Sequence, residues 1–123
     1  MTKKEFNIYV IDLEKKVLEE KKFKKANPQY IEGKPCVYVG STSKTPEGRY
    51  EDHKTGARNK SGNSKLFNKY AKKYGFRLKP RLYKSHNPMK TREEAEAMEK
   101  EKVRRLKKRG YAVWPNFDKD KEK

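Results

Sequence analysis

The sequence predicts a small α+β domain, with a three-stranded antiparallel sheet flanked by helices. Two runs of large apolar residues, 5–13 and 36–40, are typical of buried strands, because a strand covered on both faces is apolar at almost every position. Later segments carry helix start signals and apolar residues at helical spacing. At 123 residues the chain is long enough for one domain and short for two.

The first half of the chain gives two strands, an insertion and a helix. Between the strands, a Lys-rich insertion at about 13–34 has a short helical face and is expected to loop out of the sheet. Thr45-Pro46 starts a helix that runs to about Lys54, since Thr is a good N-cap and Pro fits the first helical position.

The second half adds two helices around a third strand. A helix is expected over 64–74, and a strand over 77–85 that Pro80 breaks or places at an edge. The last helix runs from Thr91 to Gly110, and an extended piece follows at 111–114. We treat 1–117 as one domain and 118–123 as a frayed tail.

Charge is the first indication of a partner. Lys and Arg number 34 against 17 Asp and Glu, which leaves a net charge of +17. A compact chain with this charge repels itself, so a polyanion is the expected counterpart. Nucleic acid, either DNA or RNA, fits best, because each neutralised phosphate releases condensed counterions. The alternative is that the lysines serve only solubility.

Other partner and site classes find little support in the composition. A membrane surface would require an amphipathic anchor, and no stretch approaches the roughly 20 apolar residues that span a bilayer. Cys36 is the single cysteine, so an internal disulfide is excluded and a cysteine-based zinc site is disfavoured. We therefore expect a soluble, intracellular protein of the cytoplasm.

One acidic residue breaks the pattern of the last helix. Ala95, Val103 and Leu106 lie on one side of it, with Glu99 in the middle of that apolar stripe. A carboxylate directed at a core costs several kcal/mol unless it gains a cation or strong hydrogen bonds. Glu99 could pair with a buried Arg or Lys, reach solvent at a loosely packed edge, or hold a divalent metal ion.

Two further groups of residues have both ordinary and functional interpretations. Arg49 and His53 lie four residues apart, on one helix face, where they are either exposed or suited to a phosphate and to proton transfer. Tyr9 and Tyr38 lie in the two strands expected to pair at the sheet centre. Their hydroxyls are either simply packed and hydrogen-bonded or converge on one pocket.

Together these residues resemble the GIY-YIG nuclease family. Its first motif appears as Asn7-Ile8-Tyr9, with Asn in place of the usual first Gly, and its second as Tyr38-Val39-Gly40. The Arg-x-x-x-His pair follows at Arg49 and His53, and the helix around Glu99 is similar to the one that bears the family's metal-binding glutamate. The resemblance covers 5–117 apart from the insertion, which makes the two tyrosine motifs unusually distant.

The resemblance implies a metal-dependent endonuclease. Glu99 would hold a single Mg²⁺ or Mn²⁺, and Arg49 would clamp the phosphate. Tyr9 would activate the attacking water, with His53 accepting or relaying its proton, and Tyr38 would position water or phosphate or serve as the base. Asn116 stands where the family often has a supporting asparagine.

Binding is expected to be dominated by phosphate contacts with low sequence specificity or with recognition of DNA structure. The expected contacts come from lysines of the insertion and from Lys44, Lys54, Arg58, Lys60 and Lys65. A non-catalytic nucleic-acid-binding module with a degenerate nuclease fold is the alternative, and a basic accessory protein on RNA is a third hypothesis. The oligomeric state is open, since one active site cuts one strand and double-strand cleavage needs a dimer or successive nicks.

Overall fold

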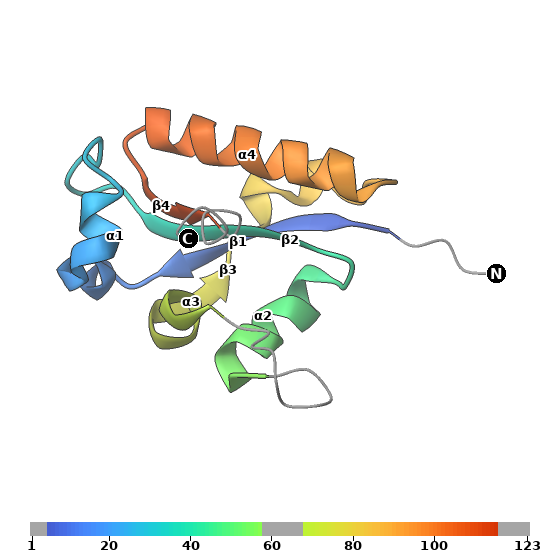
Figure 1. Ribbon diagram of the computed structural model, residues 1–123, viewed down its shortest axis with the longest axis horizontal. Helices are drawn as coiled ribbons and strands as arrows, with labels where there is room; N and C mark the ends of the chain where they lie inside the picture. The colour runs from blue at the N-terminus through green and yellow to red at the C-terminus, as the bar shows by residue number, and fades with distance from the viewer. Residues whose placement is uncertain (1–4, 58–67, 116–123) are drawn as a thin grey trace.

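The computed structural model describes residues 5–57 and 68–115, and within them it contains one four-stranded mixed sheet (Figure 1). The strands are β1 (Asn7–Leu13), β2 (Cys36–Thr42), β3 (Gly75–Leu78) and β4 (Ala112–Pro115), in the order β3-β1-β2-β4. The α+β class is confirmed. The predicted set of three antiparallel strands is wrong, because β4 adds a fourth strand parallel to β2.

The central pair of strands forms as the sequence predicts. β1 and β2 are antiparallel from Asn7 opposite Thr42 to Leu13 opposite Cys36. Residues 8–11 and 36–39 are fully buried, because α4 covers one face of the sheet while α2 and α3 cover the other (Figure 1). Burial on both faces explains why these strands show no alternation of apolar and polar residues.

The third strand is much shorter than predicted. β3 ends at Leu78, and the backbone amide of Lys79 makes one more hydrogen bond to the Val10 carbonyl, 2.9 Å long. Pro80 has no amide hydrogen to continue this pairing. It instead begins the 3-10 helix η2 (Pro80–Leu82), which is followed by η3 (Lys84–His86).

Two of the three helices that flank the sheet begin at the predicted caps. α2 (Pro46–Thr55) begins after Thr45, whose hydroxyl accepts from the Gly48 amide at 3.0 Å. α4 (Arg92–Lys108) begins after Thr91, which is bonded in the same way by the Glu94 amide. α3 (Lys69–Tyr74) covers the second part of the helix predicted over 64–74, and 64–67 lie outside the described residues.

α4 also explains why the last strand is parallel to β2. The helix has 17 residues, so it spans about 25 Å at 1.5 Å per residue and carries the chain back along the sheet. β4 therefore enters beside Cys36 and runs in the same direction as β2, as in a crossover connection. Such a connection requires a long-range pairing that the local pattern at 111–114 does not indicate.

The Lys-rich insertion lies outside the sheet between β1 and β2, as predicted, and it packs against the domain. It forms η1 (Lys15–Glu19) and α1 (Lys21–Lys25), and Phe23 stacks on Trp114 with ring centroids 6.0 Å apart. The side chain of Asn27 accepts from the Val113 amide at 2.7 Å, and Gln29 donates to the Tyr111 carbonyl at 2.8 Å. The insertion thus covers the outer edge of β4, which would otherwise present unpaired backbone groups.

The first part of β1, which β3 does not reach, is paired by a side chain. Beyond β3, Asn87 donates to the Ile8 carbonyl and accepts from the Ile8 amide, at 2.8 and 2.9 Å. Next to it, Phe6 and Met89 form an isolated antiparallel bridge. These contacts hold the strand that carries Tyr9.

Among the described residues, none of the helices is long and apolar enough to cross a lipid bilayer.

The Asn27 contact predicts a measurable contribution to stability. Asn27 is 4% exposed, so Asn27→Ala leaves the buried Val113 amide without its acceptor and should lower the free energy of unfolding by about 1–3 kcal/mol. Urea denaturation measures the change. Lys25→Ala, at an exposed position of the same insertion, should change stability by less than about 0.5 kcal/mol. Equal effects of the two substitutions would contradict this role.

Candidate active site

The two predicted tyrosines lie side by side on the face of the sheet that α2 covers. Tyr9 and Tyr38 are fully buried, with ring centroids 6.1 Å apart. Gly40 lies directly opposite Tyr9 in the register, and a Cβ atom there would lie 2.5 Å from the Tyr9 hydroxyl. Glycine at this position therefore allows the Tyr9 ring to lie across β2.

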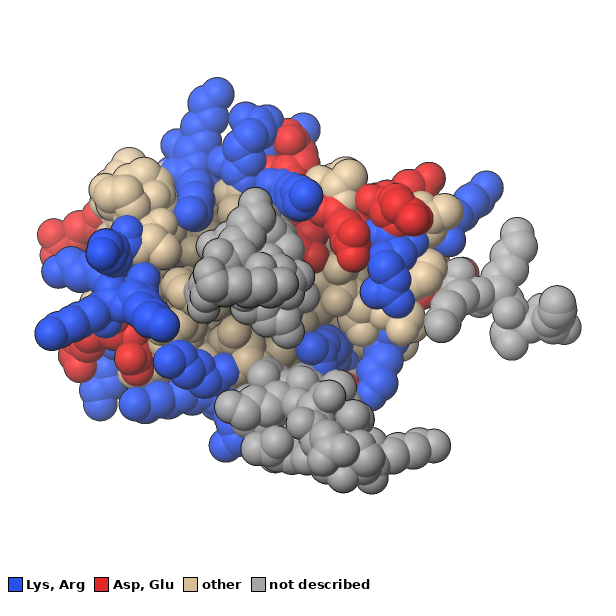
Figure 2. Space-filling model, in the orientation of Figure 1, with Lys and Arg blue, Asp and Glu red and all other residues tan. Residues whose placement is uncertain are grey.

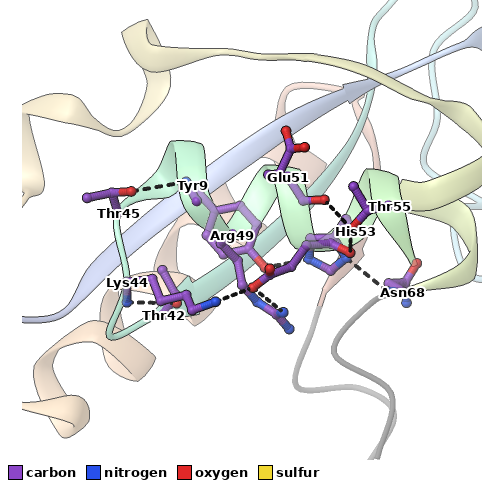
Figure 3. Close-up of polar contacts among 11 residues, drawn as sticks. Tyr9, Thr42, Lys44, Thr45, Arg49, Glu51, His53, Thr55 and Asn68 are labelled. Carbon is purple, nitrogen blue, oxygen red and sulfur yellow. Dashed lines mark hydrogen bonds and ion pairs between the residues drawn. The ribbon is translucent and has the colours of Figure 1, made fainter. Parts of the chain in front are cut away.

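α2 brings His53 against both rings. The His53 side chain is fully buried, and its Nε2 lies 2.9 Å from the Tyr9 hydroxyl (Figure 3). The centroid of its ring is 5.1 Å from that of Tyr38. Arg49 lies one turn earlier on the same helix, and its side chain is 17% exposed. The structure thus brings together Tyr9, Tyr38, Arg49 and His53, as the resemblance implies.

The protonation of His53 follows from its second hydrogen bond. The backbone amide of Asn68 donates to Nδ1 at 2.9 Å, so Nδ1 carries no proton. In the neutral ring the proton is then on Nε2, which donates to the Tyr9 hydroxyl oxygen. In this arrangement His53 cannot accept the Tyr9 proton at Nε2, which does not fit the acceptor role that the resemblance implies.

Burial and hydrogen bonds act in opposite directions on the two phenols. Burial raises the pKa of Tyr9 to about 12, although the charge of Arg49 and a hydrogen bond with Tyr38 lower it. Burial raises the pKa of Tyr38 well above its usual value, and its interactions with Tyr9 raise it further. The bond between the phenols therefore favours ionisation of Tyr9 over Tyr38, because it lowers the pKa of the first and raises that of the second.

Glu99 is buried on α4, which excludes the alternative that it reaches solvent at a loosely packed edge. It is 2% exposed and shares the buried side of the helix with Ala95, Val103 and Leu106. α4 covers the opposite face of the sheet from α2 (Figure 1), yet the charge of Glu99 contributes to raising the pKa of both Tyr9 and Tyr38. The candidate site therefore draws on both helical layers.

Asp52 lies between Arg49 of its own helix and Lys44 of the loop before α2. Asp52 lies 3.8 Å from the Arg49 guanidinium and 2.7 Å from Nζ of Lys44. The Lys44 carbonyl accepts in turn from the side chain of Asn7 at 3.0 Å. Asn7 thus connects the start of β1 to the loop before α2. Lys44 lies beside the candidate site, and its side chain is 55% exposed.

Lys54 has a structural position that the sequence does not indicate. Its ammonium group donates to the carbonyls of Lys72 and Gly75, at 2.8 and 2.6 Å. It therefore caps the end of α3, and this use competes with the predicted phosphate contact. The other predicted contacts (Arg58, Lys60 and Lys65) and the supporting Asn116 lie outside the described residues.

The possible metal ligands are few. Within residues 5–57 and 68–115, no three His, Cys, Asp or Glu side chains form a group that could hold a metal ion. The charge of Glu99 acts on Tyr9 and Tyr38, and the carboxylate and the two phenols all offer oxygen donors. This donor set fits a hard divalent cation such as Mg²⁺ or Mn²⁺, which commonly binds one or two carboxylates and keeps several waters.

Sequence reasoning missed the residues that orient this group. Asn68 is the N-cap of α3, with its side chain accepting from the amides of Tyr70 and Ala71, so an Asn before a helix could have indicated the cap. Nothing in the sequence indicates its backbone contact to His53.

No family model, no curated protein and no solved structure matches the chain.

The pKa of Tyr9 gives stability a dependence on pH. The folded state holds this proton up to about pH 12, whereas an unfolded tyrosine loses it near 10. The protonated Tyr9 therefore contributes to the free energy of unfolding. This contribution is complete below pH 10 and is lost as pH rises towards 12, at about 1.4 kcal/mol per pH unit. In Tyr9→Phe the fall in unfolding free energy over this range should be shallower by that amount.

Urea denaturation at several pH values between 10 and 12 measures this slope. Tyr111→Phe, a partly buried tyrosine outside the site, is the control for the loss of one phenol. If Tyr9→Phe and the native sequence lose stability with the same slope, the Tyr9 hydroxyl is not held in its protonated form as described.

Proposed function

We propose that this chain is a metal-dependent endonuclease of the GIY-YIG type that hydrolyses phosphodiester bonds in DNA. The observation that carries the proposal is the Tyr9 hydroxyl, which receives a hydrogen bond from a fully buried His53 at 2.9 Å. Arg49 and Glu99 both act on the pKa of this same hydroxyl. A phenol, a guanidinium and a carboxylate around one point are the groups that phosphodiester hydrolysis can use.

In this proposal Tyr9 is the general base. Its oxygen accepts from His53 Nε2, and a hydrogen bond with Tyr38 and the charge of Arg49 both lower its pKa. These interactions stabilise a phenolate, which takes a proton from the attacking water. The phenol must first lose its own proton to water, because the Nε2 of His53 already carries one. His53 is thus a positioning residue that holds the Tyr9 oxygen as an acceptor.

Arg49 is the group that we assign to the phosphate. It lies on α2 with Asp52 3.8 Å away, and its side chain is 17% exposed at the edge of the buried cluster. A guanidinium has a fork of donors that suits phosphate oxygens and offsets the charge gained in the transition state. Lys44, bound to the same Asp52 and more exposed, supplies a neighbouring contact to the backbone.

Glu99 is the residue that would hold the metal ion. A divalent cation there would polarise the scissile phosphate and reverse the sign of the local charge that now raises the pKa of the tyrosines. The net charge of +17 supports a nucleic-acid substrate, with low sequence specificity or recognition of DNA structure.

The second candidate is a non-catalytic nucleic-acid-binding module with the same fold. One observation favours it: both tyrosines are fully buried, and burial raises the pKa of Tyr9 to about 12. At neutral pH the phenolate would then be very rare unless a bound cation stabilised it. The two candidates differ in a single respect, which is metal-dependent cleavage.

Nicking of supercoiled plasmid separates the two candidates. With Mg²⁺ or Mn²⁺ at low salt the chain should convert plasmid to open circles, and chelator should abolish this. Glu99→Gln should lower the rate by at least about 10²-fold, because it removes the charge that would hold the cation. Glu96→Gln, an exposed glutamate on the same helix, should keep the rate within about threefold.

Circular dichroism and urea denaturation establish that the Glu99→Gln variant is folded. Salt-sensitive binding without nicking by the native chain would favour the non-catalytic module. Equal nicking by Glu99→Gln and Glu96→Gln would reject Glu99 as the metal ligand.

A further inference from the structure

A second concentration of positive charge lies away from the candidate active site. Arg77, Lys79 and Arg81 from the segment at β3 and η2, together with Arg109 after α4, line a hollow of about 450 Å³. Tyr111 lines it as well. We call the hollow that these four cationic side chains line the basic groove.

The groove lies on the other face of the sheet from His53. The carboxylate of Asp12 receives Nε of Arg77 at 3.0 Å and lies 3.4 Å from Nζ of Lys79. Asp12 is three positions from Tyr9 on β1, so the two side chains point to opposite faces. The groove therefore shares the face that α4 covers, whereas His53 packs on the α2 face (Figure 1).

Asp12 binds two of the four cations of the groove. It is 5% exposed and accepts from both cations through one oxygen, so it holds Arg77 and Lys79 in place. The contact uses Nε of Arg77, and a guanidinium has four more N–H donors on its two terminal nitrogens. One carboxylate against four cationic side chains leaves the groove strongly positive.

The neighbouring half of α4 adds to this positive field. Along α4, acidic residues concentrate in the first half and basic residues in the second (Figure 2). The pKa of Lys102 is lowered by partial burial and then by the charges of Arg105 and Arg109. The pKa of His86 is lowered by burial and then by Lys102 and Arg105. These cations repel one another, and a bound anion would relieve that repulsion.

We propose that the basic groove binds the phosphate backbone of a second nucleic-acid segment, separate from the segment at the candidate active site. Three of its four cations are arginines, whose planar forks suit phosphate oxygens, and Tyr111 offers a ring for stacking. A straight duplex lying on one face of the sheet cannot also contact the other. The chain would therefore hold two duplexes at once, a binding property that does not depend on cleavage.

Energy transfer between two dye-labelled duplexes tests this directly. One short duplex carries a donor dye and the other an acceptor, and chelator is present throughout so that no cleavage occurs. The native chain should bring the two duplexes together. Arg81→Gln/Arg109→Gln should lose this transfer while still binding one duplex, because both substituted side chains line the groove and Asp12 keeps its partners.

The matched control removes the same charge elsewhere. Lys21→Gln/Lys25→Gln changes two exposed lysines of α1 and should preserve the transfer. In the groove variant, the slope of log binding constant for the second duplex against log salt should fall by up to about 1.8, which is about 0.9 for each of two phosphate contacts.

Unchanged transfer in the groove variant, or an equal loss in the α1 variant, would overturn the proposal. ATP and inorganic phosphate are added as competitors in the presence of chelator. Expulsion of the second duplex by ATP at a concentration where inorganic phosphate has no effect would also overturn it, because the groove would then be a site for free nucleotides.

Discussion

The hydrogen bond from the Asn68 amide to Nδ1 of His53 determines how the candidate site can work. A backbone amide can only donate, so this bond places the ring proton on Nε2 and directs it at the Tyr9 hydroxyl. The same contact ties the start of α3 to α2, and through Tyr9 to the central strand. Both ends of the imidazole are therefore fixed, and its orientation and tautomer follow from the fold.

The other parts of the site depend on close approach at β2. Gly40 leaves room for the Tyr9 ring, and without that room the hydroxyl could not lie beside His53. The α2 layer contributes Arg49 and His53, and the α4 layer contributes the buried charge of Glu99. A carboxylate that raises the pKa of two nearby phenols is unfavourable for ionising either of them. In the proposed function, a cation that offset this charge would make ionisation of Tyr9 easier.

Features with a local cause could be predicted from the sequence. The apolar strands, the caps at Thr45 and Thr91, and the burial of Glu99 follow from propensity, side-chain capping and helical spacing. Asn27, Asn68 and Asn87 could not be assigned, because their decisive partners are 86, 15 and 79 residues away. For the same reason, no short stretch of the sequence indicates that β4 pairs parallel to β2. Nor does any indicate that the insertion covers the outer edge of β4. The contact of Lys54 with the end of α3 could not be predicted either, because an ammonium that caps a helix looks the same in sequence as one that binds phosphate.

The central claim is that the ring proton of His53 is on Nε2 and is directed at the Tyr9 hydroxyl. ¹H–¹⁵N NMR of the imidazole nitrogens tests this claim most directly. His53 and His86 are the only histidines in the sequence, so a His86→Gln variant assigns the signals of His53. At neutral pH the account predicts an unprotonated Nδ1 and a protonated Nε2, with Nε2 in hydrogen-bond contact with Tyr9. A proton on Nδ1, or a doubly protonated ring, would contradict it.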